Sequence, residues 1–281
     1  MKKMIATMLS FVSLLSLSAC GSSNSSSSAA NDAIEAEEKG EIKYSKSQGP
    51  YTELFEAAIV PILEEQGYTL TAIETSELLV ADQLLNNGEV DVNVEQHTAY
   101  AENFNESNHA DLLPISPIPT VPAGVYSVNH NSLEEIAEGA KIAVPNDAAN
   151  TARCYVMLQK VGWIKLDPDV DPTTVTQDDI IENSYNLKFT EMKSLTIPAA
   201  IQDFDYVAIT GSVVYNAGID ASTALENEDI LDHLILQVVV KESNKDTVWA
   251  KAIVDAYHSD EFKRYMEENN NGLWWIPEEL Q

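Results

Sequence analysis

Residues 141–153 read KIAVPNDAANTAR, an apolar run that turns at proline and asparagine into an alanine-rich segment. The apolar run predicts a buried strand, and Asn146 or Asp147 is suited to cap the N-terminus of a following helix. A strand, a short turn and a helix form the repeating unit of an α/β domain with a largely parallel sheet. The stretch therefore predicts the fold class and a helix start at which an anion can bind.

The same alternation continues on both sides of this stretch. Toward the N-terminus it predicts strands at 42–45, 69–74, 90–94 and 124–128 and helices at 51–66, 78–87 and 98–108. Toward the C-terminus, after a helix at 150–161, it predicts strands at 188–191, 206–209 and 234–240 and helices at 197–203 and 247–267. We expect two lobes joined by two crossovers, with residues 41–129 and 231–281 in the first lobe and 130–230 in the second.

The N-terminus carries a targeting signal. Lys2 and Lys3 precede a serine-interrupted apolar stretch that ends at Ala19, so residues 1–19 are predicted to be a secretory signal peptide. An uncleaved transmembrane helix is the alternative, but the run is short for a span of about 20 residues. Small residues before Cys20 resemble the lipobox of bacterial lipoproteins, so Cys20 is expected to carry a lipid. Residues 20–40, rich in Ser and Ala and then acidic, predict a flexible tether.

Composition narrows the functional classes. A formal net charge of −29 makes nucleic acid an implausible partner and leaves the lipid to hold the chain at an extracytoplasmic membrane surface. With Cys20 lipidated, Cys154 has no partner for a disulfide. Phosphate-binding loops, nucleophile elbows and paired-cysteine or His-Glu-x-x-His metal motifs are missing from the sequence, and the five histidines are widely spaced. The sequence favours neither an enzyme nor a resident metal or cofactor.

Asn150 and Arg153 are the first candidate binding residues. Free amides at a helix N-terminus and a nearby guanidinium suit a carboxylate, because the planar fork of Arg can contact both carboxylate oxygens. A capped surface helix with a solvated Arg is the alternative interpretation of this spacing.

Two further segments present polar groups where strands are predicted to end. Glu95, His97 and Tyr100 follow the predicted strand 90–94, and Thr210 precedes a glycine after the strand 206–209. Ligands of open α/β sheets collect outside the carboxyl ends of strands. His97 is also suited to a capping or structural role, and Thr210 to an ordinary turn.

The chain resembles the NlpA family of lipoproteins, which includes the methionine-binding lipoproteins of ABC importers. The resemblance covers nearly all of the chain after the tether and is carried by five motifs in order: Gln96-His97-x-x-Tyr100, Pro119-Thr120-x-Pro122-x-Gly124-x-Tyr126, Pro145-Asn146-Asp147-x-x-Asn150-x-x-Arg153, Gly162-Trp163-Ile164-Lys165-Leu166 and Ala256-Tyr257-x-Ser259-Asp260.

This resemblance implies a two-lobe, periplasmic-binding-protein-like (type II) fold that closes over a free amino acid and delivers it to a membrane permease with its ATPase. Arg153 would then hold the ligand carboxylate, with Asn150 beside it and His97 and Tyr100 lining the side-chain pocket. One lipid anchor and one ligand per chain fit a monomer.

Three positions depart from the family pattern. Glu95 stands where the family usually has an aromatic residue, Leu78, with Glu77 before it, lies near where an Asp-Tyr pair is usual, and Thr210 replaces an Asn. A carboxylate in place of an aromatic ring removes apolar contact and introduces a charge that needs a partner when buried. The ligand is therefore either methionine or a more polar or cationic amino acid, a derivative or a small peptide. A surface adhesion or interaction lipoprotein that keeps the scaffold without transport is the alternative function.

Overall fold

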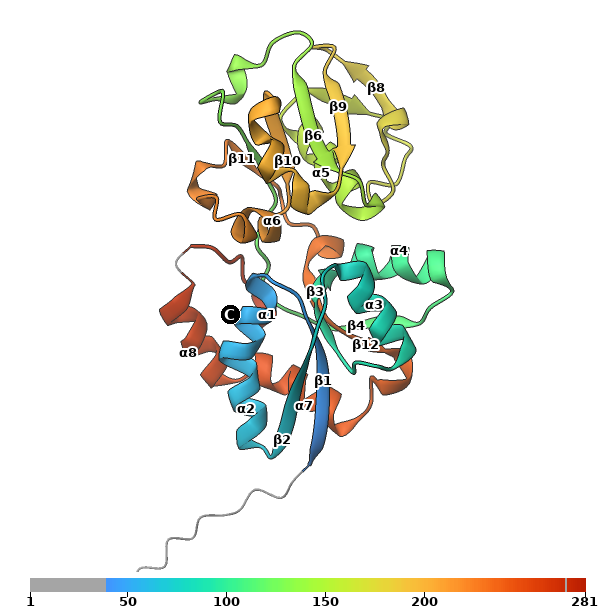
Figure 1. Cartoon of the computed structure of the whole chain (residues 1–281), viewed down its shortest axis with the longest axis vertical. Coiled ribbons are helices and arrows are strands. Elements are labelled where there is room, and N and C mark those ends of the chain that lie inside the picture. Colours follow the sequence, from blue (N-terminus) through green and yellow to red (C-terminus); the bar gives the residue numbers. More distant parts are fainter. Residues whose placement is uncertain (1–38, 271) are drawn as a thin grey trace, which may run out of the picture. The chain divides into compact units, whose positions relative to one another are not determined.

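The computed structural model describes residues 39–270 and 272–281, all of which belong to one structural unit (Figure 1). The predicted signal peptide at 1–19, the predicted lipid-bearing Cys20 and all but the last two residues of the predicted tether lie outside the described residues.

Helices and short strands alternate along the described chain. The helices are α1 Pro50–Leu54, α2 Val60–Glu65, α3 Leu78–Asn87, α4 Thr98–Asn108, α5 Ala148–Lys160, α6 Gly211–Asn216, α7 Val248–Tyr257 and α8 Asp260–Asn269. The strands are β1 Gly40–Lys46, β2 Tyr68–Glu74, β3 Asn93–His97, β4 Leu112–Pro117, β5 Gly124–Tyr126, β6 Lys141–Pro145, β7 Ile164–Leu166, β8 Ile180–Asn183, β9 Lys188–Met192, β10 Tyr206–Ile209, β11 Glu226–Asn227 and β12 Leu236–Lys241.

The first lobe is built from five strands. β1 pairs in parallel with β2, and β12 pairs antiparallel with β3 on one side and β4 on the other. A parallel bridge between Tyr44 and Val92 connects these two groups. Helices α7 and α8 pack here too, because Ile253 and Phe262 share a buried core with Ile42 of β1.

The second lobe contains a five-stranded sheet in the order β11-β5-β10-β6-β9. β6 is parallel to β9 and β10, whereas β5 is antiparallel to β10. Helix α5 covers this sheet with Tyr155 and Leu158, which pack in one core with Ile142 and Tyr206. Both lobes therefore have mixed sheets rather than largely parallel ones, because β5 and β12 enter them from the crossovers in the opposite direction.

The chain passes between the two lobes twice, between β4 and β5 and between β11 and β12. The first crossover comes earlier than the predicted boundary at 129/130, since Gly124–Tyr126 already pairs with β10. The prediction assigned the strand 124–128 to the first lobe. The sequence of so short a strand, which spans Gly124–Tyr126 in the structure, does not indicate which sheet it joins. The rest of the predicted division into lobes stays a prediction.

Two predicted helices are interrupted. A π-helical turn, Phe55–Ile59, separates α1 from α2. Pro61 has no N–H to donate and its ring clashes with the carbonyl four residues earlier, which accounts for the widened turn. The predicted helix 247–267 divides into α7 and α8, because Ser259 leaves helical geometry and its side chain caps the N–H of Phe262 at 3.1 Å.

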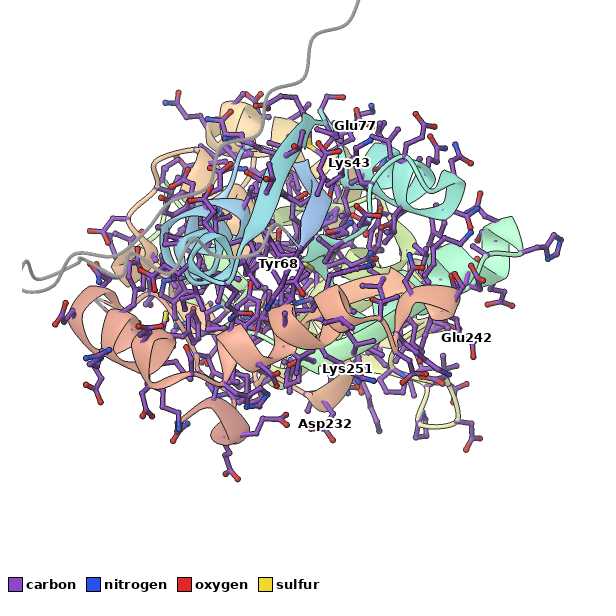
Figure 2. All side chains as sticks on the ribbon, turned by 90° about the horizontal axis from the view of Figure 1, so that it is seen from below. Lys43, Tyr68, Glu77, Asp232, Glu242 and Lys251 are labelled. Atoms are coloured by element: carbon purple, nitrogen blue, oxygen red, sulfur yellow. The ribbon has the colours of Figure 1, made fainter. Side chains whose placement is uncertain are left out.

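Acidic and basic side chains lie on the outside of the lobes, as Asp232, Glu242 and Lys251 do in Figure 2. Among the described residues, no helix combines the length and apolarity needed to span a bilayer. Within the same residues, no group of three or more His, Cys, Asp or Glu side chains is arranged to hold a metal ion.

Candidate functional site

A cavity of about 1000 Å³ is lined by residues of both lobes. A smaller cavity of about 50 Å³ adjoins it, since the two share lining residues such as Tyr51 and Ser212. The six binding residues predicted from the sequence all line the smaller cavity, and four of them also line the larger one: Glu95, Tyr100, Asn150 and Thr210. Residues up to 115 positions apart in sequence thus meet in one place, while their roles as ligand contacts stay predictions.

The turn between β6 and α5 positions the first part of the site. Asp147 is the N-cap of α5, and its Oδ1 accepts the backbone N–H of Asn150 at 3.0 Å and the Asn150 side-chain amide at 2.9 Å. Of the two residues that the sequence suggested as the cap, Asn146 and Asp147, Asp147 is the N-cap. Because the side-chain N–H of Asn150 donates to Asp147, the Oδ1 atom of Asn150 points the other way, toward His97 and Arg153.

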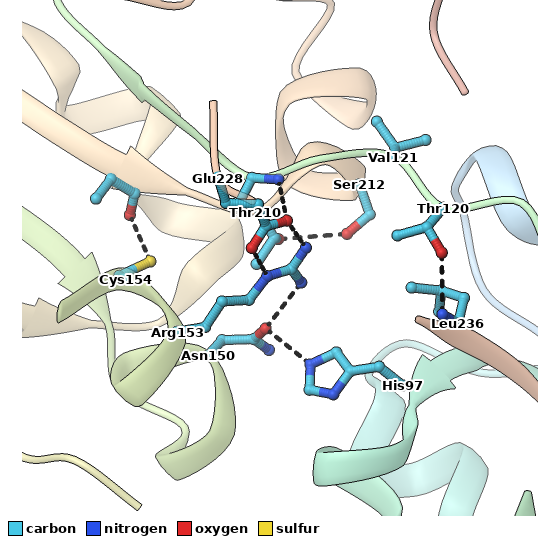
Figure 3. A network of polar contacts seen from close by, with 12 residues as sticks. His97, Thr120, Val121, Asn150, Arg153, Cys154, Thr210, Ser212, Glu228 and Leu236 are labelled. Atoms are coloured by element: carbon cyan, nitrogen blue, oxygen red, sulfur yellow. Dashed lines mark hydrogen bonds and ion pairs between the residues drawn. The ribbon is translucent and has the colours of Figure 1, made fainter. Parts of the chain in front are cut away.

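Arg153 is buried and paired with a carboxylate of the protein itself. Its Nε and Nη2 groups donate to the two oxygens of Glu228, and both side chains are 4% exposed (Figure 3). Burial alone lowers the pKa of Arg153, but the adjacent Glu228 carboxylate outweighs this effect and raises it. The alternative of a solvated Arg is wrong. The third guanidinium nitrogen, Nη1, donates instead toward Asn150 Oδ1 at 3.5 Å.

Glu228 also connects this ion pair to the first crossover. Its Oε1 accepts the backbone N–H of Ala123 at 2.7 Å, and its own backbone N–H donates to the Ala123 carbonyl at 3.0 Å. Sequence reasoning missed Glu228, because it lies in an acidic segment with no motif around it. Only the fold reveals that it faces Arg153, 75 positions away.

His97 joins the two lobes. Its Nδ1 accepts the backbone N–H of Tyr100 at 3.2 Å, so it caps α4, and its Nε2 lies 3.3 Å from Asn150 Oδ1. Since Nδ1 accepts, the proton resides on Nε2, which donates to Asn150. Burial and the nearby Arg153 charge lower the pKa of His97 to about 3, so the ring is neutral. The structural role that the sequence left open for His97 is present here.

Thr210 closes the site at the end of β10. Its Oγ1 lies 3.4 Å from the hydroxyl of Ser212 at the start of α6. Gly211 between them has no room for a side chain, because a Cβ would lie 2.6 Å from the Pro122 carbonyl oxygen and 2.4 Å from Val121. The first crossover therefore passes directly against this turn. The sequence left an ordinary turn open here as the alternative to a binding role, and it missed the short helix α6.

Glu95 lies on β3 in the first lobe and lines both cavities. Its Oε1 accepts from the backbone N–H of Ser47 at 3.1 Å and from the hydroxyls of Ser47 and Thr52. Burial raises the pKa of Glu95, whereas these three donors oppose that change. Leu78, the other first-lobe departure from the family pattern, lines both cavities at the start of α3.

Three contacts connect the lobes around the larger cavity. Lys193 Nζ lies 3.0 Å from Glu77 Oε1, the Tyr215 hydroxyl donates to Glu53 at 2.6 Å, and the Asn216 amide donates to the Gln48 carbonyl at 2.8 Å. The Lys193 and Glu77 side chains are 69% and 51% exposed, so this ion pair is screened by water. All three contacts are exposed to solvent, unlike the buried pair of Arg153 and Glu228, and we call the region that they occupy the mouth of the larger cavity.

The chain was compared with known proteins. A family model described as NlpA lipoprotein matches residues 42–275. The D-methionine-binding lipoprotein MetQ of Salmonella typhi is 28% identical over 243 residues, covering 85% of this chain and 89% of the relative. A lipoprotein from Ruminococcus gnavus has a crystal structure with a TM-score of 0.79 and 33% identity, covering 85% of this chain and 99% of that one.

A nutrient-binding protein from Burkholderia cenocepacia, whose structure was solved bound to methionine, has a TM-score of 0.79 and 28% identity, covering 84% of this chain and 99% of that one. This likeness confirms the predicted α/β, periplasmic-binding-protein-like fold with two lobes and two crossovers.

Proposed function

Because this chain belongs to the NlpA lipoprotein family, we propose that it is the extracytoplasmic receptor of an ABC importer and captures a small amino-acid-like ligand between its lobes. The observation that carries the proposal is the cavity of about 1000 Å³ lined by both lobes. Cavities of this size accommodate small molecules and bury most of their surface. The names of the relatives support a substrate-binding role rather than an enzymatic one.

The proposal assigns a role to each predicted residue. Asn150 and the Nη1 group of Arg153 contact the carboxylate of the ligand, and His97 and Tyr100 line its side chain. Asn150 already bridges Arg153 and the first-lobe His97, so a ligand placed there touches both lobes. Closure of two lobes over a ligand is a hinge motion, and it signals occupancy to the permease and its ATPase.

The N-terminal part of the proposal concerns localisation. A lipid on Cys20 tethers the receptor to the outside of the cell membrane, and residues 20–40 allow it to reach the permease. One receptor chain binds one ligand and works as a monomer.

Titration calorimetry of the twenty amino acids against protein unfolded and refolded to remove bound ligand tests the proposal. The variant Ser212→Phe places a ring in both cavities, and Ser184→Phe, at an exposed position lining neither, is its matched control. We expect a ligand to bind wild type and Ser184→Phe equally, and Ser212→Phe to lose at least about 10-fold in affinity through steric exclusion.

Equal binding by both variants would place the ligand elsewhere. Absence of binding by every amino acid, with an intact unfolding transition, would favour an interaction lipoprotein that kept the scaffold.

A further inference from the structure

Cations that line the two cavities are already paired within the described chain. Lys193 pairs with Glu77 at the mouth, and Arg153 pairs with Glu228. His97 is neutral because its pKa is lowered to about 3 by burial. Among the acids, Asp147 accepts from Asn150 and, at 3.4 Å, from the hydroxyl of Ser194. Asp147 and Glu95 are therefore the two lining carboxylates without an ion pair among the described residues, and of these two only Glu95 has a buried oxygen that receives no hydrogen bond.

The two oxygens of Glu95 differ. Oε1 receives all three hydrogen bonds, from the Ser47 backbone and from the hydroxyls of Ser47 and Thr52. Oε2 is buried and has no hydrogen-bond partner. A buried carboxylate oxygen without a donor costs free energy, because it has lost water and gained nothing in return. The three donors hold the side chain in one orientation, so Oε2 cannot turn to find a partner within the protein.

Three other oxygens without a hydrogen-bond partner belong to residues that line these cavities: Asn216 Oδ1, Gln96 Oε1 and the Thr75 hydroxyl oxygen. The orientations of the two amide oxygens are set by their amide nitrogens, since the Asn216 amide donates to the Gln48 carbonyl and the Gln96 amide donates to Asp82. The ionised Glu95 carboxylate and the two amide oxygens only accept, and the Thr75 hydroxyl can accept as well as donate, so a hydrogen-bond donor satisfies all four. An ammonium or a guanidinium carries several donors and no acceptor.

On these grounds, and resting on the proposed function, we propose that the side chain of the ligand presents a cationic nitrogen group, an ammonium or a guanidinium, to Oε2 of Glu95. Glu95 is then the residue that selects the ligand side chain. An apolar ligand side chain such as a thioether would leave Oε2 of Glu95 without water and without a hydrogen-bond donor. A cation supplies the donor and balances the charge of the carboxylate.

Two matched pairs of compounds test this inference by calorimetry on the same refolded protein. Lysine is compared with norleucine, which has the same chain with a methyl in place of the aminomethyl group, and arginine is compared with its neutral counterpart citrulline. We expect wild type to prefer at least one cationic member by about 10- to 100-fold, the range of a hydrogen bond to a charged group. In Glu95→Gln, which keeps an acceptor for Ser47 and Thr52, this preference should fall to within about 3-fold.

Glu77→Gln is the matched control. It removes the same charge at the mouth of the larger cavity, and a direct contact at Glu95 predicts that it keeps the preference of wild type. Unchanged affinity of Glu95→Gln for a neutral amino acid shows that this variant is folded.

Equal binding of both members of each pair by wild type overturns the inference and leaves the proposed function standing. A preference that survives in Glu95→Gln also overturns it. No binding of any amino acid by wild type overturns the proposed function, and the inference with it.

Discussion

At the scale of single residues, the buried acids Glu228 and Asp82 differ in their surroundings, because Glu228 has a counter-charge and Asp82 has none among its hydrogen-bond partners. Glu228 forms an ion pair with Arg153 and also accepts the backbone N–H of Ala123. Asp82 has only amide partners, Asn93 and Gln96, both of which donate to its Oδ1, while Oδ2 has none. A charge beside a counter-charge tolerates burial, whereas a lone charge shifts its pKa toward the neutral form.

Glu228→Gln is expected to destabilise the protein strongly. The variant keeps the shape of the side chain but leaves the Arg153 guanidinium buried without a counter-charge, which costs about 3–5 kcal/mol. Guanidinium chloride unfolding at pH 7 measures the loss. Glu77→Gln removes one partner of the exposed pair with Lys193 and should cost less than about 1 kcal/mol. Equal effects of the two substitutions would mean that the buried pair is not what stabilises this region.

Asp82 predicts a pH dependence of stability. Burial raises its pKa from 3.8 to about 7 in the folded chain, so between these values the unfolded chain releases a proton that the folded chain retains. Stability attributable to Asp82 therefore falls as pH rises from about 4 to 7 and stays constant above that range.

Asp82→Asn cannot ionise and lacks this loss. The difference in unfolding free energy between variant and wild type should increase by roughly 2–4 kcal/mol from pH 4 to pH 8, measured by denaturant titration. A difference that is constant with pH would show that Asp82 ionises normally in the folded chain.

At the scale of elements, the sequence predicted best those that begin and end at local signals. Strand 206–209 and helices 78–87 and 98–108 were predicted with the bounds that the structure has. β3 was predicted at 90–94 but spans Asn93–His97, because its ends are set by pairing with β12. Helix α6 and strands β7, β8 and β11 were missed, since each is too short for periodicity to reveal, and strand β4 was missed because its prolines are not typical of a strand. The six predicted site residues lie together. Glu228, which pairs with Arg153, was not predicted, because no motif surrounds it in the sequence.

The boundary between α7 and α8 gives an element-scale prediction. Ser259 caps α8 through the N–H of Phe262, so Ser259→Ala should reduce the unfolding free energy by about 1 kcal/mol. Ser184→Ala, at an exposed serine that caps no helix, should change it by less than about 0.5 kcal/mol. Equal effects in chemical denaturation would show that the cap is not what separates the two helices.

At the scale of the whole molecule, the contacts at the mouth bias the two lobes toward each other. Tyr215 to Glu53 and Lys193 to Glu77 are single, exposed contacts worth little individually. The proposed receptor has to open to release its ligand, and weak contacts allow this, because strong contacts between the lobes would keep the ligand-free protein closed.

The double variant Tyr215→Phe, Lys193→Ala should therefore shift the ligand-free population toward separated lobes. We expect a larger radius of gyration in small-angle X-ray scattering, and ligand affinity reduced by about 2- to 10-fold, because closure then costs more of the binding energy. A saturating ligand should restore the wild-type radius. An unchanged radius and affinity would show that these contacts do not influence closure.

Capture of a ligand between the lobes is tested most directly by mass spectrometry of the small molecules that native protein releases on denaturation. We predict about one equivalent of a single amino-acid-like compound with a basic nitrogen in its side chain. This compound should be absent from Ser212→Phe purified in parallel. Release of nothing from wild type, together with no thermal stabilisation by any amino acid, would contradict a receptor that captures a ligand in this cavity.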